Sequence, residues 1–382
     1  MRLSLIPLGT ACGAPSATAG VPLALGLSAV ALGLAWLTLR LVENPVRFHR
    51  AFRRRPRRAL VFGAALSVGA SALSFTATAV PPTIETGAPA PALARTLADA
   101  PAPRARLTEL LASSPTALPG NLLPPLPQVR SSRSAVYRDG CHADYAATGT
   151  RPCVYGDRTS SRTVVLFGDS HAAQWFPALQ RLATTRGWKL VSLTKASCKV
   201  ADVTIVSGHQ PYTACDTWRS HALARIRTLR PALVVVSSSD AGDPARPAAD
   251  PLRQWTTGFE STFRALGTSG ARVAALLDTP WPQGDPIDCA ARNSLQLRAC
   301  ARPVPDAFRD ASRRGALRAA AATTGTTVID PTPWLCAPRT GICPVIVADT
   351  AVYRDDSHLS EAYAEALAPV LAPSLDRLAG TP

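Results

Sequence analysis

From residue 158 onward, short apolar runs alternate with longer segments in which apolar residues recur every three or four positions. The short runs predict strands at 163–167, 190–193, 232–237, 272–277 and 326–329. The longer segments predict helices at 172–186, 217–229, 252–266, 306–323 and 360–378. Strands that alternate with helices are typical of an α/β domain whose parallel sheet lies between two layers of helices. We therefore predict a three-layer α/β domain with a parallel sheet over residues 158–382.

Two uncharged apolar stretches near the start of the chain, at 21–39 and 59–80, lack this alternation. They contain 19 and 22 residues, close to the ~20 that cross a bilayer as a helix. A signal peptide is the alternative for the first stretch, but no basic segment directly precedes it. We therefore predict a membrane hairpin over residues 1–82. Eight arginines lie at 40–58, which predicts that this loop is cytoplasmic and that the chain after residue 80 is outside.

Between these two regions the chain is rich in proline. Residues 81–135 contain eleven prolines in 55 positions, a composition typical of extended linkers rather than of packed domains. A short helical pattern at 104–113 is the exception, and we expect it to dock on the following domain. The sequence thus predicts a proline-rich spacer and extension over residues 83–157.

The stretch TVVLFGDSHAAQWFP, residues 163–177, contains the first candidate for chemistry. An apolar strand breaks at Gly168, and Asp169, Ser170 and His171 lead into a helical pattern. Such a turn places the Ser170 hydroxyl at the carboxyl edge of the sheet, beside free N–H groups of the next helix that can stabilise an oxyanion. An ordinary turn followed by a helix N-cap is the alternative.

The second candidate lies near the end of the chain, in the segment YRDDSHLS at 353–360. A carboxylate three residues before a histidine allows one short segment to supply both a general base and the group that orients it. His358 is the candidate base and Asp355 the candidate orienting carboxylate. Asp356 competes with Asp355 for that role.

The combination of GDSH after a first strand and D-x-x-H-L-S before a last helix resembles the SGNH hydrolase superfamily. It is similar in particular to the SGNH domains fused behind acyltransferase-3 membrane domains, which modify cell-surface glycans. The resemblance implies that Ser170 is the nucleophile, His358 the base and Asp355 its partner. It also implies an oxyanion site around Gly168, Asp169 and the Ser170 N–H.

The chain departs from the superfamily pattern at the rest of the oxyanion site. Members usually add a glycine after the second strand and an asparagine after the third. Here the second strand is followed by TKASC at 194–198 and the third ends in SSSD at 237–240. We therefore expect the Ser170 N–H to be the main donor. His171 and Trp334 are candidate substrate-side residues. A structural role is the alternative for His171, which is expected to point away from the Ser170 hydroxyl, and a core position is the alternative for Trp334.

The arginine-rich loop contains a second family signature. Glu43, Pro45 and Arg47 resemble the E-x-P-x-R signature that follows the tenth membrane helix of acyltransferase-3 proteins. Those proteins have about ten membrane helices, whereas this sequence shows two clear apolar stretches. The resemblance therefore implies that acyl groups are delivered by an acyltransferase-3 membrane domain that is missing from this chain.

The nine cysteines are distributed as one isolated residue, Cys12, and four close pairs. No pair has the C-x-x-C spacing of a zinc site, so we predict four disulfides between near neighbours and no metal. The predicted pairs are Cys141 with Cys153, Cys198 with Cys215, Cys289 with Cys300, and Cys336 with Cys343. Disulfides require an oxidising compartment, which agrees with an extracytoplasmic domain at the cell membrane.

The net charge of +15 does not predict a nucleic-acid partner. Residues 1–58 hold nine arginines and one acidic residue, and therefore carry about half of this charge. Only three of the 41 basic residues are lysines, which indicates a GC-rich coding bias. The chain also lacks a glycine-rich phosphate loop, so we expect no cofactor.

These observations predict a membrane-anchored, extracytoplasmic O-acyltransferase that moves an acyl group, expected to be acetyl, to a cell-surface glycan. A carbohydrate esterase that uses the same residues with water as acceptor is the first alternative. A non-catalytic glycan-binding domain is the second, and the incomplete oxyanion site is its motive.

Overall fold

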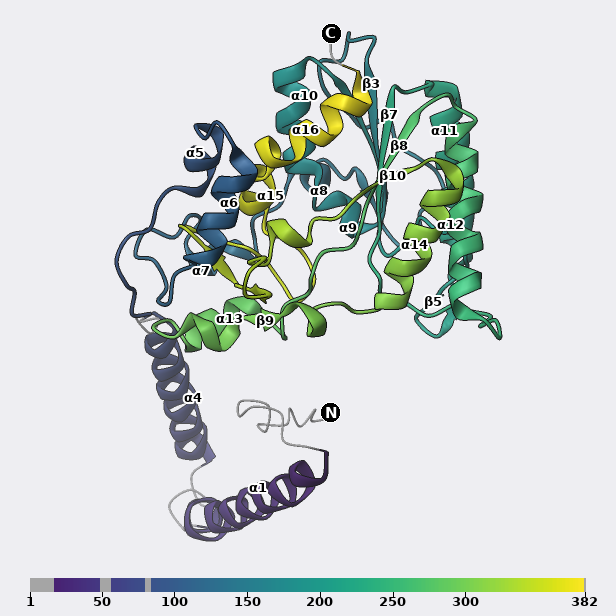
Figure 1. The fold of residues 1–382 in the computed structure, drawn as a ribbon. Coiled ribbons are helices and arrows are strands. Elements are labelled where there is room, and N and C mark those ends of the chain that lie inside the picture. Colours follow the sequence, from purple (N-terminus) through teal and green to yellow (C-terminus); the bar gives the residue numbers. More distant parts are fainter. Residues whose placement is uncertain (1–16, 49–55, 80–83, 381–382) are drawn as a thin grey trace. The chain divides into compact units, whose positions relative to one another are not determined.

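The computed structural model describes residues 17–48, 56–79 and 84–380. The chain divides into two units, Met1–Thr83 and Ile84–Pro382, which are described separately. Figure 1 shows the ribbon and the labels used below.

The first unit contains two long helices. Helix α1 spans Ala17–Thr38 and continues through a π-helical turn, Leu39–Glu43, into α2, Asn44–Phe48; α4 spans Pro56–Ala79. Helices thus form at both stretches where spans were predicted, 21–39 and 59–80. Within the described residues, however, no helix combines the length and the apolar content needed to cross a membrane. The predicted pair of transmembrane helices is therefore not supported.

The second unit is built on a seven-stranded sheet, which confirms the predicted fold class. Its strands are β1 (His142–Ala143), β2 (Val154–Gly156), β3 (Thr163–Gly168), β4 (Lys189–Lys195), β7 (Leu233–Ser237), β8 (Arg272–Leu276) and β10 (Thr327–Ile329). Their order is β1-β4-β3-β7-β8-β10, with parallel neighbours throughout, and β2 pairs antiparallel with β4. All five predicted strands are present, and β3 lies between β4 and β7 with every residue buried.

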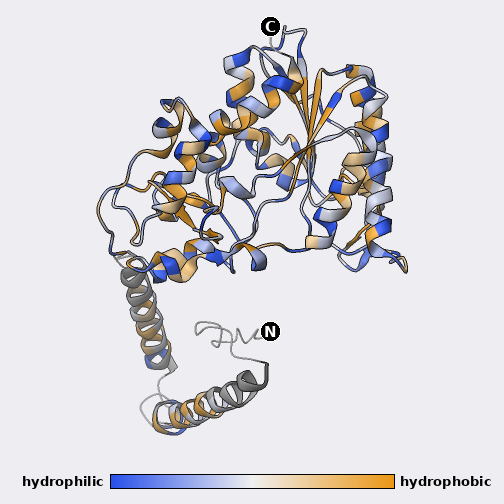
Figure 2. Ribbon diagram, in the orientation of Figure 1, coloured by the Kyte–Doolittle hydropathy of each residue, from blue (hydrophilic) through white to orange (hydrophobic). Residues whose placement is uncertain are grey.

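Helices cover both faces of this sheet, as predicted (Figure 1). One face carries α10 (Phe176–Arg186), α15 (Glu361–Ala366) and α16 (Ala368–Ala379), and the other carries α11 (Thr213–Leu229), α12 (Pro251–Gly267) and α14 (Ala311–Thr324). Alternate residues of β3 enter the two cores: Val164 and Leu166 one, Val165 and Phe167 the other. Figure 2 accordingly shows the central strands as strongly hydrophobic.

Two helices that the periodicity predicts as continuous are broken. The segment at 172–186 divides into α9 (Ser170–Ala173) and α10, and the segment at 360–378 divides into α15 and α16. Pro177 lies at the start of α10 and Pro369 at the start of α16. Proline lacks the N–H that would continue the preceding helix but fits the first turn of a new one.

The proline-rich segment is packed, contrary to the predicted spacer. It forms α5 (Leu93–Ala98), α6 (Pro103–Ala112), α7 (Leu126–Val129) and α8 (Ala135–Arg138). Leu93, Leu97 and Leu107 are fully buried in the core beneath α15 and α16. The prolines lie largely at helix starts and in connections, so leucines at helical spacing can still supply a buried face. Helix α6 matches the predicted docking helix at 104–113.

The remaining elements are short and lie in the connections. They are β5 (Val206–Ser207), β6 (Gln210–Pro211), α13 (Pro286–Arg292), η2 (Leu297–Cys300), β9 (Arg302–Pro303), η3 (Val304–Asp306), η4 (Thr332–Trp334), β11 (Ile342–Cys343), β12 (Ile346–Val347) and β13 (Thr350–Ala351).

The cysteine predictions are confirmed for the eight paired residues. The four bonds are Cys141–Cys153, Cys198–Cys215, Cys289–Cys300 and Cys336–Cys343. Each closes a short loop, so each restricts the unfolded chain and stabilises the fold by an amount on the order of 3 kcal/mol. Cys12 lies outside the described residues.

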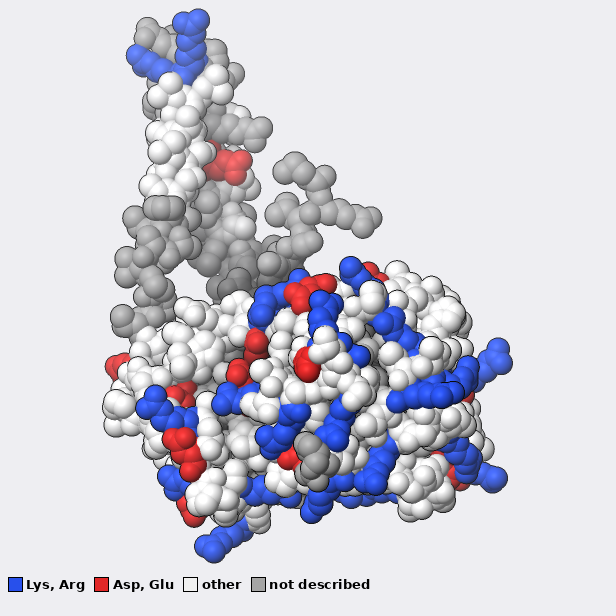
Figure 3. Space-filling model, turned by 90° about the horizontal axis from the view of Figure 1, so that it is seen from above, with Lys and Arg blue, Asp and Glu red and all other residues white. Residues whose placement is uncertain are grey.

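The basic side chains form no single cluster on the face shown in Figure 3. Lysines and arginines are spread among uncharged surface, and several lie beside acidic residues. Ion pairs such as Arg186 with Asp376 and Arg130 with Asp288 neutralise part of the charge locally.

Candidate active site

The turn after β3 requires glycine at its first position. Gly168 has a φ of +147°, and a Cβ there would lie 1.8 Å from the Ser237 carbonyl oxygen on β7. Asp169 then caps α9 by accepting a hydrogen bond from the His171 N–H at 2.8 Å. Ser170 is therefore the first residue of a helix at the carboxyl end of the central strand, half-buried, as the sequence predicts.

The structure brings Ser170, His358 and Asp355 together. The Ser170 Oγ lies 2.8 Å from the His358 Nε2. The His358 Nδ1 lies 2.9 and 3.1 Å from the two carboxylate oxygens of Asp355. Because an ionised carboxylate only accepts, the Nδ1–H donates to Asp355, and the Nε2 is left to accept from the serine hydroxyl. This is the geometry that a serine nucleophile and its base require.

The segment that carries His358 and Asp355 is held by its own hydrogen bonds. The Asp355 Oδ1 accepts from the backbone N–H groups of Ser357 and His358, at 3.1 and 2.7 Å. The Leu359 N–H donates to the Gln174 Oε1 at 2.9 Å, which ties the segment to the residues after α9. Asp356 is exposed. The D-x-x-H spacing therefore identified the carboxylate that contacts the histidine.

Opposing effects set the protonation of this pair. Burial raises the pKa of Asp355, but hydrogen bonding to His358 and the charges of His358 and Arg354 outweigh it, so the pKa is well below its usual range. Burial lowers the pKa of His358, and the charge of His171 lowers it further, against the raising effect of Asp355. Asp355 is thus ionised and His358 is neutral at pH 7, which are the states that a base and its orienting group need.

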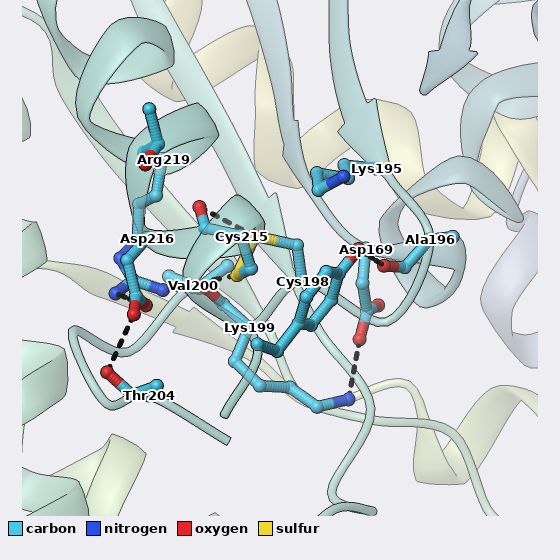
Figure 4. The surroundings of a disulfide bond; sticks show 12 residues. Asp169, Lys195, Ala196, Cys198, Lys199, Val200, Thr204, Cys215, Asp216 and Arg219 are labelled. Carbon is cyan, nitrogen blue, oxygen red and sulfur yellow. Dashed lines mark hydrogen bonds and ion pairs between the residues drawn. A yellow bond between two sulfur atoms is a disulfide. The ribbon is translucent and has the colours of Figure 1, made fainter. Parts of the chain in front are cut away.

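Beneath the triad lies a buried ion pair that the sequence did not reveal. The Lys199 Nζ donates to the Asp169 Oδ2 at 2.8 Å and to the Ser239 Oγ at 2.5 Å. The Ser239 N–H also donates to Asp169, at 3.0 Å. The Lys199 and Asp169 side chains are 4% and 0% exposed. Figure 4 shows Lys199 reaching Asp169 beside the disulfide of Cys198, its neighbour in the chain.

This ion pair engages Asp169, one of the residues of the predicted oxyanion site. The Asp169 carboxylate fixes the turn. The Ser239 N–H, which follows the third predicted strand, already donates to Asp169 and not to an oxyanion. The backbone N–H of Ser170 stands in the first turn of α9, where helical N–H groups have no partner within the helix. It therefore remains the donor that the geometry favours.

His171 contacts the residues around the triad histidine. Its ring lies beside the His358 ring, with centroids 4.7 Å apart. Its Nδ1 lies 2.5 Å from the Asp278 Oδ1, and the two side chains are 3% and 1% exposed. Its other neighbour is Trp281, stacked at 5.3 Å. His171 is thus a buried residue of the site, which agrees with a structural role rather than a substrate-side one.

Trp334 is a core residue, the alternative that the sequence analysis left open. It is 6% exposed and packs edge-on against Trp175, with ring centroids 6.0 Å apart. Its carbonyl accepts from the Tyr363 hydroxyl at 2.6 Å. Its placement does not support a role in stacking on substrate.

A cavity of about 390 Å³ lies next to the triad segment and was not predicted. Its lining includes Trp281, which stacks on His171, and Asp356, which follows Asp355 in the chain. Arg309 lies 5.9 Å from the Trp281 ring centroid and is exposed. An aromatic face beside charged hydrogen-bonding groups suits a polar, ring-shaped ligand.

The fold and the site together define a class of protein: an α/β protein with a serine, a histidine and an aspartate in hydrogen-bond contact at the carboxyl end of a central strand. A family model for the SGNH domain fused to AT3 domains matches residues 140–373. The chain belongs to this family, and it is an enzyme that acts on ester bonds. The AT3 domain itself is not seen in this chain.

The solved structures that match the chain share little sequence with it. The periplasmic domain of a lipopolysaccharide acetyltransferase from Salmonella ser. Paratyphi A matches with 13% identity and a TM-score of 0.46, over 73% of this chain and 99% of that one. A carbohydrate acetylesterase family member from Sinorhizobium meliloti matches with 12% identity and a TM-score of 0.35, over 57% and 99%. A putative acylhydrolase from Bacteroides fragilis matches with 14% identity and a TM-score of 0.34, over 59% and 91%. None of the curated proteins compared matches significantly.

Proposed function

We propose that the chain is an extracytoplasmic O-acyltransferase that carries an acyl group on Ser170 and passes it to a sugar hydroxyl. The observation that carries this proposal is the continuous set of contacts from the Ser170 Oγ through the His358 imidazole to the Asp355 carboxylate. The family, described as fused to AT3 domains, and four disulfides support the acyl chemistry and the extracytoplasmic site.

The reaction proceeds in two acyl transfers. The Ser170 Oγ attacks the carbonyl carbon of the donor while its proton moves to the His358 Nε2. The tetrahedral intermediate collapses, His358 gives that proton to the leaving group, and an ester on Ser170 remains. The acceptor hydroxyl then gives its proton to His358 and attacks the ester carbonyl. Collapse returns the proton to the Ser170 Oγ and releases the acylated product.

The surroundings of Ser170 stabilise each intermediate. Its own N–H, at the start of α9, faces the developing oxyanion, and removal of one such donor typically costs about 3 kcal/mol. In this proposal the acceptor sugar binds in the cavity lined by Trp281, Arg309 and Asp356, and Asp356 is two residues before His358 in the chain. The acyl donor comes, in this proposal, from an acyltransferase-3 membrane domain.

Hydrolysis of a carbohydrate ester is the second candidate. His358 and Asp355 are 18% and 33% exposed, so water can reach the acyl-enzyme as well as a sugar can. The same residues would then perform the reaction with water in place of the acceptor hydroxyl.

A single experiment separates these functions. The purified full chain and Ser170→Ala are compared for hydrolysis of 4-nitrophenyl acetate, for acetyl transfer to added oligosaccharides, and for labelling by a serine-directed phosphonate. We expect the native chain to be labelled at Ser170 and the variant to lose both labelling and turnover. Transfer in excess of hydrolysis supports the acyltransferase and hydrolysis alone supports the esterase. Labelling and turnover that persist unchanged in Ser170→Ala would contradict both.

A further inference from the structure

A second histidine–aspartate pair lies directly beside the triad. His171 and Asp278 are 107 residues apart in the chain and meet through a 2.5 Å contact between the Nδ1 and the Oδ1. The His171 ring centroid lies 4.7 Å from that of His358. The triad contacts do not include this pair, and nothing in a Ser-His-Asp mechanism requires it.

Asp278 is fixed as an anion by donors other than His171. Its Oδ1 accepts from the Thr279 N–H at 2.8 Å, and its Oδ2 accepts from the Asp240 N–H and the Trp281 Nε1, both at 2.9 Å. Hydrogen bonds to both oxygens stabilise the charged form of a carboxylate. A buried anion then stabilises a cation on the imidazole that it contacts.

We propose that His171, held as a cation by Asp278, is a positioning residue that acts on His358 and keeps the triad histidine unprotonated between turnovers. This inference rests on the proposed function, since it assigns the electrostatic setting of the same base.

The titratable and charged groups around His358 come from three parts of the fold. Asp355 and Arg354 belong to its own segment, His171 comes from α9, and His142 comes from β1. Asp355 favours a cation on His358, whereas Arg354 and His171 oppose it. His142 carries no charge near neutral pH, because burial lowers its pKa to about 4.

The groups around His171 favour its charged form. Burial alone would lower its pKa, but the charge and hydrogen bond of Asp278 and the charge of Asp169 outweigh burial and the opposing charge of Lys199, so the pKa is raised. Asp240, next to Asp278, adds no competing anion. Burial and the Asp278 charge raise its pKa well above the usual range.

A cation at this position has two chemical consequences. It disfavours protonation of resting His358, so the base stays available in mildly acidic surroundings. It also makes His358 a stronger acid once it has taken the Ser170 proton, which favours proton delivery to the leaving group. Both effects depend on the charge of His171 and not on its shape.

The test is the acid limb of the pH profile of kcat/KM for 4-nitrophenyl acetate hydrolysis by the full chain. His171→Gln removes the charge and keeps a polar side chain, and we expect the limb to move to higher pH by about one unit. His142→Gln is the matched control: it removes a partly buried histidine near His358 that is uncharged, and we expect the limb to stay in place. An active His171→Gln enzyme with an unmoved limb would overturn the proposal.

A second measurement does not depend on activity. NMR titration of the native chain with labelled histidine follows each imidazole, and His171 is assigned by its absence in His171→Gln or, if that variant does not fold, in His171→Asn. We expect the His171 imidazole to remain protonated above pH 7 while that of His358 is neutral. A neutral His171 at pH 6 would overturn the inference without touching the proposed function. Absence of any Ser170-dependent turnover would instead contradict the function itself.

Discussion

The active site has two regions that use the same groups in opposite surroundings. In the first, His358 and Asp355 are three residues apart and partly exposed, at 18% and 33%. In the second, His171–Asp278 and Lys199–Asp169 join distant parts of the chain, and all four side chains are at most 4% exposed. The pKa of His358 is lowered and that of His171 is raised. Burial and partner, rather than residue type, therefore decide which histidine can act as a base.

The two regions should respond differently to substitution. Charge pairs at an exposed edge contribute little to stability, whereas breaking a buried pair leaves an uncompensated charge. We expect changes to His358 and Asp355 to remove activity without unfolding the protein. Changes to the buried pairs, His171–Asp278 and Lys199–Asp169, should lower the free energy of unfolding before they affect activity.

The largest effect is expected for the triad histidine. His358→Ala removes the imidazole that we propose as the base for Ser170, and ester hydrolysis should fall by about 10³-fold or more. The melting temperature should change little because the side chain is at the edge of the fold. Stopped assays of 4-nitrophenyl acetate hydrolysis and thermal melts of the same sample measure the two quantities.

Asp355→Asn and Asp356→Asn form the matched pair for this prediction. Asn at 355 keeps the shape but loses the charge that orients His358, and should cost less than His358→Ala. Asn at 356 changes an exposed side chain and should leave hydrolysis within about twofold. A larger loss at 356 than at 355 would show that Asp356, and not Asp355, orients His358.

Substitution of Lys199 tests the buried Lys199–Asp169 pair. Lys199→Met fills a similar volume but leaves Asp169 as a buried charge without its cation, so we expect the free energy of unfolding to fall by about 3 kcal/mol. Lys189→Met, on the half-buried first residue of β4, is the control. Chemical denaturation of both variants checks this. Equal stability of the two would show that Ser239 and the His171 N–H suffice to hold Asp169.

Sequence patterns revealed one of these two regions and missed the other. Ser170 and the His358–Asp355 pair were predictable because each depends on a few adjacent residues. His171–Asp278 and Lys199–Asp169 depend on the strand order, which brings the carboxyl ends of β3, β4, β7 and β8 to one edge. No spacing in the sequence states that order.

Weak signals for the missed region were nevertheless present. Lys199 is one of three lysines in a chain whose other 38 basic residues are arginines, which marks its position as unusual. Asp278 directly follows a predicted strand, where site residues of parallel sheets gather. The spacer prediction failed for a related reason, because proline content was weighed above the leucines at helical spacing.

The smallest effect is a difference in how the two histidines couple stability to pH. The pKa of His171 is raised in the fold, so the folded protein binds the imidazole proton more tightly than the unfolded chain does. This proton binding stabilises the fold fully below the unfolded pKa near 6.5, and the stabilisation is lost as pH rises through the folded pKa. The pKa of His358 is lowered, so its contribution has the opposite sign and is lost as pH falls. The free energy of unfolding of native chain minus His171→Gln should therefore decrease from pH 5.5 to 8.5, and that of native chain minus His358→Gln should increase. Denaturant titrations at constant ionic strength measure both differences. If both differences changed with pH in the same direction, the two histidines would not differ in how they couple stability to pH.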